Sequence, residues 1–254
     1  MTAPSGERRP VVVIVVAAGR SRRMATEGGG LNKLMLTAGG RPVLAWTLAT
    51  FNRHPEVRRI YVTASEDDLA PYRDLVTREG LNKVAAVVLG GRERQESVWL
   101  ALRHVAENDF EAGLDPLVAV HDGARPLVSA ECLSGVFAAA REEAERSGGG
   151  ALLCVPAKET VKRVVEGVVL ETIPREQMMM AQTPQVFPLQ TLLAAHQAAE
   201  VAGRAATDDA MLVEDAGGRV RVVVGDYENI KITTPEDLVV LEGILEQRAQ
   251  RPRG

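Results

Sequence analysis

Apolar residues in this chain fall into short runs, separated by longer segments with helical periodicity. The first run, residues 11–16, reads Val-Val-Val-Ile-Val-Val. It predicts a strand buried on both faces, because it offers no polar position to solvent. Four further apolar runs also predict strands. They lie at residues 57–64, 83–89, 117–120 and 151–155.

Helical patterns occupy the intervals between these runs. Residues 66–79 are helical in composition, and Val98, Leu102 and Val105 recur at helical spacing. Ser129 is a suitable N-cap for a helix over residues 129–146. The alternation predicts an α/β fold with a single doubly wound, mostly parallel sheet, whose ligands bind at the carboxyl ends of the strands.

One segment, at about 156–176, breaks the alternation. Apolar and polar residues alternate on both sides of Glu166-Gly167, which predicts an inserted β-hairpin. Such a hairpin either projects as an arm or covers an edge of the sheet, and a projecting arm is suited to contact a second subunit. We therefore expect one domain over residues 11–248, with flexible tails at 1–9 and 249–254.

Bulk composition is ordinary for a soluble enzyme. Of 254 residues, 46% are hydrophobic and 25% charged, and the net charge of −4 argues against nucleic-acid binding. The polar N-terminus and the lack of a run of about 18 apolar residues predict no membrane span and a cytoplasmic location. Cys132 and Cys154 lack metal-ligand spacing, which is typical of reduced thiols.

Small residues and positive charges follow the first strand. Ala17-Ala18-Gly19 would let backbone N–H groups approach a ligand, while the arginines within residues 20–23 and Lys33 supply the charge that a polyphosphate needs. The segment lacks both G-x-G-x-x-G and G-x-x-x-x-G-K-[ST], so a dinucleotide fold and a P-loop are disfavoured. It predicts a nucleoside triphosphate site, against the alternative of a solvated basic loop.

A second motif, His121-Asp122-Gly123-Ala124-Arg125-Pro126, follows a predicted strand. Asp122 is suited to hold Mg²⁺ at the rim of the sheet, although such an aspartate also commonly caps a helix or forms a turn. Gly123 and Ala124 leave room for a ribose. Arg125 is expected to lock the loop by pairing with a carboxylate, and His121 is expected to be structural, because transfer to an ionised phosphate needs no base.

Two further sets of residues suit substrate recognition. Gly90-Gly91 permits close backbone approach at a strand end, and Ser97 lies one turn into the next helix. These residues suit recognition of a base; the alternative is that Gly90-Gly91 is only a turn and Ser97 only a surface residue of the helix. Hydroxyls and cations at the ends of several elements would suit a small phosphorylated polyol, although each one alone is as well explained as a turn, cap or surface residue. They are Thr160, Lys162, Arg175, Thr183, Thr207 and Lys231.

Taken in order, these motifs resemble the 2-C-methyl-D-erythritol 4-phosphate cytidylyltransferases of the non-mevalonate isoprenoid pathway. The resemblance covers roughly residues 11–245. It is carried by Ala17-Ala18-Gly19, Arg22-Arg23-Met24, Lys33, Gly90-Gly91, Arg94, Ser97-Val98, His121-Asp122, Ala124-Arg125-Pro126, Thr160, Lys162, Thr183-Pro184-Gln185, Phe187, Thr207-Asp208 and residues 229–233.

The resemblance implies a Rossmann-like nucleotidyltransferase, homodimeric through interlocking hairpin arms, that uses Mg²⁺, CTP and a polyol phosphate. The implied catalytic residues are Arg23, Lys33, Asp122 and Lys231, with Asp122 as the metal ligand. The implied nucleotide-binding residues are Ala17, Ala18, Gly19, Arg20, Ser21, Arg22, Gly90, Gly91, Arg94, Ser97, Asp122 and Gly123. The implied polyol-phosphate-binding residues are Thr160, Arg175, Thr183, Thr207 and Lys231.

The chain departs from the family pattern at a few positions, and two rival functions remain as alternatives. Arg20-Ser21 replaces an aromatic or small residue and a glycine, residues 28–30 lengthen the approach to Lys33, and Gly123 replaces the more usual alanine. A ribitol 5-phosphate cytidylyltransferase is the close rival, but those enzymes tend to carry Ser-Val where this chain has Gly123-Ala124. A non-catalytic nucleotide-binding protein is the rival of another class.

Overall fold

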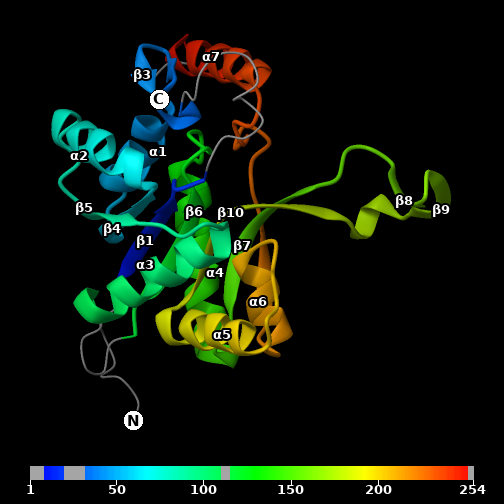
Figure 1. Cartoon of the computed structure of the whole chain (residues 1–254). Helices are drawn as coiled ribbons and strands as arrows, with labels where there is room; N and C mark the ends of the chain where they lie inside the picture. Colours follow the sequence, from blue (N-terminus) through cyan, green and yellow to red (C-terminus); the bar gives the residue numbers. More distant parts are fainter. Residues whose placement is uncertain (1–8, 20–31, 110–114, 251–254) are drawn as a thin grey trace.

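The computed structural model describes residues 9–19, 32–109 and 115–250, and its core is one seven-stranded sheet (Figure 1). The strand order is β11-β7-β10-β6-β1-β4-β5. All neighbouring strands are parallel except β10, which is antiparallel to both β6 and β7. The predicted mostly parallel sheet is therefore confirmed. The strands are β1 (Val11–Val16), β4 (Val57–Ala64), β5 (Val84–Leu89), β6 (Leu117–Asp122), β7 (Gly150–Pro156), β10 (Met179–Pro188) and β11 (Val220–Val224).

Helices cover both faces of this sheet. They are α1 (Val43–Arg53), α2 (Leu69–Arg78), α3 (Arg94–Asp109), α4 (Ala130–Ser147), α5 (Leu189–Val201), α6 (Asp209–Asp215) and α7 (Pro235–Gln250). Among the described residues, 3₁₀ turns η2 (Lys33–Met35), η3 (Glu66–Asp68) and η4 (Arg175–Gln177) accompany them, and a small ladder joins β2 (Thr37–Ala38) to β3 (Arg41–Pro42). No helix in the described part of the chain is long and apolar enough to cross a membrane.

Strand β1 separates two apolar cores, as its unbroken β-branched sequence predicts. Val11, Val13 and Val15 pack into a core shared with α1, α2 and α4. Val12 and Ile14 point the other way, into a core shared with α3, α5 and α6. Side chains alternate across a strand, so only a run that is apolar at every position can serve two buried faces.

The chain reverses its direction of winding between β1 and β6. From β1 it continues through β4 to β5 on one side, and then α3 returns it to β6 on the other side of β1. Val16, the last residue of β1, pairs with Asp122, the last residue of β6. The carboxyl ends of these two strands therefore form the topological switch point, where ligands of doubly wound sheets bind.

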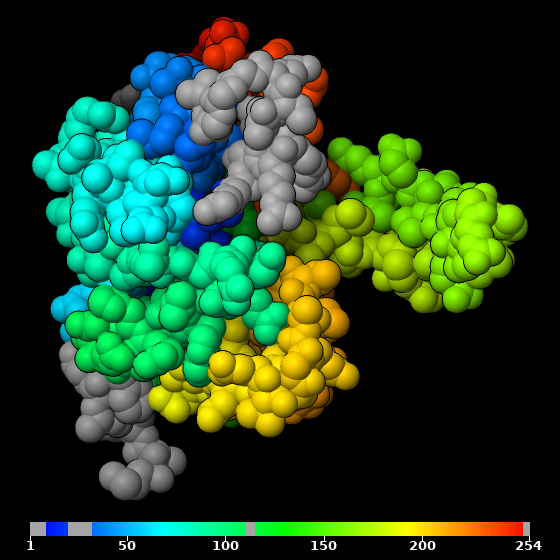
Figure 2. Space-filling model, viewed as in Figure 1, coloured from blue at the N-terminus to red at the C-terminus, as the bar shows by residue number. Residues whose placement is uncertain are grey.

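The predicted hairpin is confirmed as a projecting arm. Strands β8 (Val161–Val165) and β9 (Val168–Ile173) pair antiparallel and lie well away from the sheet (Figures 1 and 2). Their two-residue turn has positive φ at Glu166 (50°) and Gly167 (81°), as tight hairpin turns require. The arm leaves the sheet after β7 and returns to it as β10.

The sequence pattern did not predict β10, because polar Gln182, Thr183 and Gln185 interrupt its apolar run. All three are buried, and their polar atoms find partners inside the protein. At the predicted tails, Arg9 forms an ion pair with Asp115 at 3.3 Å and α7 continues to Gln250. Residues 1–8 and 251–254 lie outside the described residues.

Candidate active site

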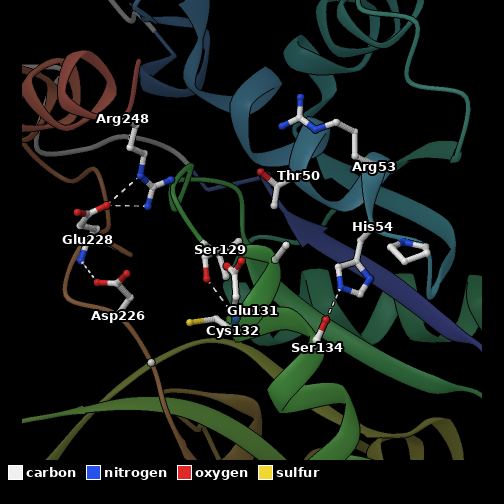
Figure 3. A pocket seen from close by; sticks show the side chains of 14 residues that line it. Thr50, Arg53, His54, Ser129, Glu131, Cys132, Ser134, Asp226, Glu228 and Arg248 are labelled. Atoms are coloured by element: carbon white, nitrogen blue, oxygen red, sulfur yellow. Dashed lines mark hydrogen bonds and ion pairs between the residues drawn. The ribbon is translucent and has the colours of Figure 1, made fainter. Parts of the chain in front are cut away.

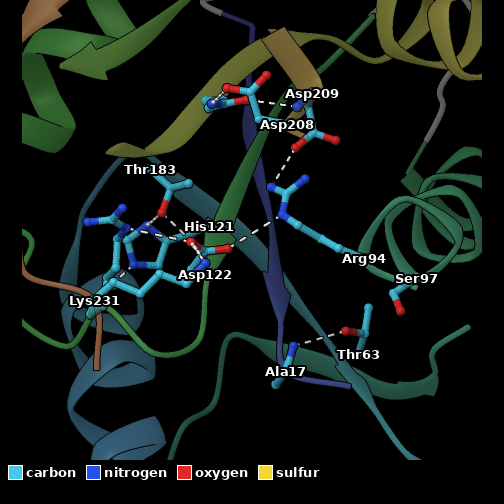
Figure 4. A network of polar contacts seen from close by, with 12 residues as sticks. Ala17, Thr63, Arg94, Ser97, His121, Asp122, Thr183, Asp208, Asp209 and Lys231 are labelled. Carbon is cyan, nitrogen blue, oxygen red and sulfur yellow. Dashed lines mark hydrogen bonds and ion pairs between the residues drawn. The ribbon is translucent and has the colours of Figure 1, made fainter. Parts of the chain in front are cut away.

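The carboxylate of Asp122 lies at the switch point among three cationic side chains (Figure 4). Lys231 Nζ is 2.9 Å from Asp122 Oδ2, Arg94 Nε is 3.5 Å from Oδ1, and Arg125 Nε is 3.6 Å from Oδ2. Burial alone would raise the pKa of Asp122, but the charges of Lys231 and Arg94 outweigh it and hold this pKa well below its usual range. The carboxylate is therefore ionised at any ordinary pH.

These cations come from three separate elements. Arg94 is the first residue of α3, Arg125 lies in the loop after β6, and Lys231 precedes α7. Arg125 also donates from Nη1 to the carbonyl oxygen of Asn229 at 2.7 Å. The prediction that Arg125 locks its loop by pairing with a carboxylate is confirmed.

Arg94 bridges Asp122 to a second buried carboxylate that the sequence analysis missed. Its Nη2 is 2.7 Å from Asp209 Oδ2, and the other oxygen of Asp209 is 3.2 Å from His196 Nε2. The backbone N–H groups of Asp209 and Ala210 donate to Gln185 Oε1. The available sequence signal was the pair Asp208-Asp209 at a helix start, but it does not reveal that Asp209 turns inward toward Arg94.

His121 and Thr183 form a buried support under Asp122. The backbone N–H of Asp122 donates to Thr183 Oγ1 at 3.0 Å, and this hydroxyl lies 3.1 Å from His121 Nδ1. His121 Nε2 is 3.0 Å from the carbonyl oxygen of Arg125. This network is satisfied by a neutral imidazole that carries its proton on Nε2. Thr183, predicted to bind the polyol phosphate, uses its hydroxyl within the protein here.

Burial lowers the pKa of His121 to about 4, and this shift predicts a pH-dependent stability. Between that value and the usual pKa of about 6.5 the unfolded chain binds a proton that the folded protein does not, so stability falls as pH decreases. We expect the unfolding free energy of the wild type to fall by about 2 kcal/mol more than that of His121→Asn between pH 7 and pH 5. Urea titrations at both pH values measure this; parallel losses in the two proteins would contradict it.

The small residues after β1 are held by neighbouring elements. The N–H of Ala17 donates to Thr63 Oγ1 at 3.0 Å, and the carbonyl of Ala17 accepts from the Tyr72 hydroxyl at 3.3 Å. Gly19 is exposed, and a Cβ there would meet nothing within 4 Å. Ala18 is buried. The predicted site residues Arg20, Ser21, Arg22 and Arg23 lie outside the described residues.

Lys33 begins η2 and is linked to this corner of the sheet through its neighbour. Asn32 caps η2 by accepting from Leu34 N at 3.0 Å. Its Nδ2 donates to the Tyr72 hydroxyl and to Asp68 Oδ1, both at 2.6 Å. Since Tyr72 also contacts Ala17, the segment that carries Lys33 is connected to the end of β1.

The loop between β5 and α3 packs closely against the end of β1 at Gly90. A Cβ at Gly90 would lie 2.3 Å from the Cβ of Ala18 and 2.9 Å from Ser97 Oγ, so no larger residue fits without displacing the loop. Ser97 is buried; its hydroxyl accepts from Gly91 N at 3.0 Å and lies 2.9 Å from the carbonyl of Glu93. In this structure Ser97 shapes the loop.

Gly123 joins the ends of the two strands at the switch point. Its N–H donates to the carbonyl of Val16 at 2.9 Å, and a Cβ at this position would lie 3.1 Å from that same oxygen. Glycine therefore lets the loop after β6 lie against the end of β1 without the small shift that an alanine Cβ would need.

The predicted polyol-phosphate residues do not all lie together. Lys231 and Thr183 contact the Asp122 region directly. Thr207 is exposed just before α6. Thr160 and Arg175 are exposed on the arm, which extends away from the sheet of its own chain (Figure 2). Among the described residues, then, one chain brings Lys231 and Thr183 to Asp122, keeps Thr207 beside α6 and carries Thr160 and Arg175 on the arm.

A separate cavity of about 810 Å³ lies between the end of α1, the start of α4 and the segment before α7 (Figure 3). Its lining includes His54, Cys132 and Arg248, and it contains none of the predicted site residues. His54 Nε2 lies 3.1 Å from Ser134 Oγ at its wall. The candidate active site is therefore the Asp122 cluster at the switch point.

Comparison with known proteins identifies the family of this chain. The family profile for 2-C-methyl-D-erythritol 4-phosphate cytidylyltransferase matches residues 11–247. A relative of that name from Geobacter metallireducens is 43% identical, over 94% of this chain and 98% of its own length. One from Bacillus licheniformis is 42% identical, over 92% and 95%.

Solved structures show the same relationship. The crystal structure of 2-C-methyl-D-erythritol 4-phosphate cytidylyltransferase from Thermus thermophilus has a TM-score of 0.71 and 33% identity, covering 94% of this chain and 100% of that one. The 4-diphosphocytidyl-2C-methyl-D-erythritol synthase of Anaerococcus prevotii has a TM-score of 0.77 at 28% identity, covering 94% and 96%. This chain therefore belongs to the family of 2-C-methyl-D-erythritol 4-phosphate cytidylyltransferases.

Proposed function

We propose that this chain transfers the cytidylyl group of CTP to 2-C-methyl-D-erythritol 4-phosphate, giving 4-diphosphocytidyl-2-C-methyl-D-erythritol and pyrophosphate. The observation that carries this proposal is the family match along residues 11–247, because it is specific for both the nucleotide and the acceptor. The cluster of Arg94, Arg125 and Lys231 around Asp122 supplies, at the switch point, the positive charge that a triphosphate substrate needs.

The reaction demands charge stabilisation more than proton transfer. An oxygen of the acceptor phosphate forms a bond to the α-phosphorus in line with the departing group, and the bond from the α-phosphorus to the bridging oxygen breaks. Pyrophosphate leaves with the electron pair. The acceptor is already ionised, so no base is required, which agrees with a buried, neutral His121. Lys231 and Arg94, with the predicted Arg23 and Lys33, would orient the phosphates and stabilise the developing negative charge.

Asp122 is the residue that would hold a magnesium ion. Mg²⁺ is commonly bound through one or two carboxylates together with substrate phosphates, and the depressed pKa of Asp122 keeps its carboxylate ionised. An ionised carboxylate is the kind of oxygen donor that magnesium takes, and the triphosphate would supply further oxygens. When bound, magnesium supplies neutralising charge to the triphosphate.

We also propose a homodimer formed through the arm, and a cytoplasmic location. The arm presents five large apolar side chains, each at least 50% exposed, and apolar exposure of this kind marks protein interfaces. They are Val164, Val165, Val168, Val169 and Leu170. The unpaired thiols of Cys132 and Cys154 are typical of a reducing compartment.

Charges on the arm are expected to separate the proposed dimer. Val168→Glu with Leu170→Glu would place carboxylates in a desolvated interface, where unpaired charge is costly. Sedimentation equilibrium should show a dimer for the wild type and a monomer for this variant. Val201→Glu is the matched control, since Val201 is an exposed valine on α5 in the body of the protein. A monomeric wild type would contradict the proposal.

The proposed reaction is tested by pyrophosphate release from CTP with two acceptors. We expect turnover with 2-C-methyl-D-erythritol 4-phosphate in the presence of magnesium, a large loss after chelation, and little turnover with D-ribitol 5-phosphate. Preference for ribitol 5-phosphate would support the close rival. CTP binding in calorimetry without turnover on either acceptor would support the non-catalytic rival.

A further inference from the structure

Lys231 lies in a segment that has no regular secondary structure of its own. Residues 225–234, here called the strap, connect β11 to α7 without helix or strand hydrogen bonding. Such a segment lacks the regular backbone hydrogen bonds that would fix the position of Lys231. Some other set of contacts must therefore hold Lys231 Nζ at 2.9 Å from Asp122 Oδ2.

Asn229 connects the strap both to the sheet and to the loop after β6. Its side chain is fully buried, and Nδ2 donates to the carbonyl of Thr183 at 3.0 Å and to Gln182 Oε1 at 3.2 Å. Its own carbonyl accepts from Arg125 at 2.7 Å. One residue thus joins the strap to β10 and to the loop after β6, the two elements that support Asp122.

The chemistry of these contacts requires an amide at this position. Both partners of Nδ2 are acceptors, because the other end of Gln182 donates to the carbonyl of Asp226 at 2.8 Å. Asn229 Oδ1 is buried and has no hydrogen-bond partner among the described residues. A carboxylate of the same shape would place a third acceptor against two others, so Asn229→Asp should detach the strap without changing its volume.

A second anchor follows immediately after Lys231. Ile232 is fully buried in the core with α1, and its N–H donates to the carbonyl of Ala124 at 2.8 Å. Lys231, between the two anchors, has a side chain that is 41% exposed. Asn229 and Ile232 thus leave Lys231 little freedom except to lie over Asp122.

We propose that Asn229 is a positioning residue for the reaction: its side-chain amide holds the strap against β10 and thereby places Lys231 beside Asp122. This rests on the proposed function in one respect, namely that Lys231 acts on the substrates. Asn229 itself, being fully buried, acts through Lys231.

Kinetics of a double-mutant cycle test this proposal. Asn229→Asp should lower kcat/KM for 2-C-methyl-D-erythritol 4-phosphate by about 10²-fold, the usual cost of a misplacement near 1 Å. In a Lys231→Ala background the same substitution should change kcat/KM by less than about threefold, because the lysine it positions is gone. Asn82→Asp, the same change at an exposed position before β5, should leave activity unchanged. Equal effects of Asn229→Asp in both backgrounds, or no effect in either, would overturn the proposal.

Hydrogen–deuterium exchange gives a readout that is independent of turnover. Exchange of the strap amides, including that of Ile232, should be faster in Asn229→Asp than in the wild type, while β1 and β6 keep their protection. If Asn229→Asp does not fold, as judged by thermal melting, Asn229→Ala removes the same donor without adding an acceptor. If the wild type shows no transfer to the polyol phosphate, the proposed function fails, but exchange still tests whether Asn229 anchors the strap. Unchanged exchange in both variants would refute that role of Asn229.

Discussion

Replacing Asp122 by asparagine is expected to lower kcat by about 10²–10³-fold, comparable to the loss of one preorganised charged group at a reacting centre. The carboxylate would hold the proposed magnesium ion, and it balances Lys231, Arg94 and Arg125. An amide has the same shape but no charge, so it does neither. Pyrophosphate release at saturating CTP and magnesium measures the effect.

Two measurements separate this catalytic loss from unfolding. Arg94 retains its 2.7 Å contact with Asp209, so we expect the Asp122→Asn variant to melt cooperatively, like the wild type. Asp67→Asn is the control, because Asp67 is an exposed carboxylate in η3. A folded Asp122→Asn protein with turnover within tenfold of the wild type would remove Asp122 from the mechanism.

Replacing Lys33 by alanine is expected to reduce kcat by about 10²–10³-fold with folding intact. An ammonium group near the end of β1 would stabilise charge on the α-phosphate and the departing pyrophosphate. Its neighbour Asn32 connects it to Tyr72 and hence to Ala17. Because this charge is needed chiefly in the transition state, the dissociation constant of CTP should change much less than kcat.

Lys33→Arg and a distant lysine provide the controls. Lys33→Arg keeps the charge and should recover part of the lost turnover. Lys83→Ala removes a lysine whose Nζ bonds to the carbonyl of His54 at 2.6 Å, away from the site, and should leave kcat unchanged. If the kcat of Lys33→Ala equals that of the wild type, the catalytic role of Lys33 implied by the family resemblance is wrong.

Much of the fold follows from local pattern. The apolar run of β1 requires two buried faces, and the structure provides both. The turn Glu166-Gly167 lies between alternating residues, and its positive φ angles are those of a tight hairpin. Ser129 caps α4 as expected, accepting from Cys132 N at 3.1 Å. These features depend on neighbours in the chain, which a sequence displays directly.

The central place of β10 could not be predicted in this way. Its polar residues resemble a loop, and they are buried only because the chain returns from the arm and inserts between β6 and β7. Gln185 then forms hydrogen bonds with Asp208 and with the backbone N–H of Asp209 at the start of α6, and Thr183 forms one with His121. Such partners are far apart in sequence, so neither periodicity nor propensity reveals them.

By itself, the sequence determined the α/β class, the arm, the family and the choice of Asp122 and Lys231 as candidate site residues, because short motifs in a set order carry that information. The tertiary structure decided which charges meet. Arg94 lies between Asp122 and a buried Asp209, 115 residues away along the chain, and Asn229 anchors the strap that carries Lys231. Electrostatic and hydrogen-bonding partners are set by distance in space, which depends on strand order and on chain reversal at the switch point.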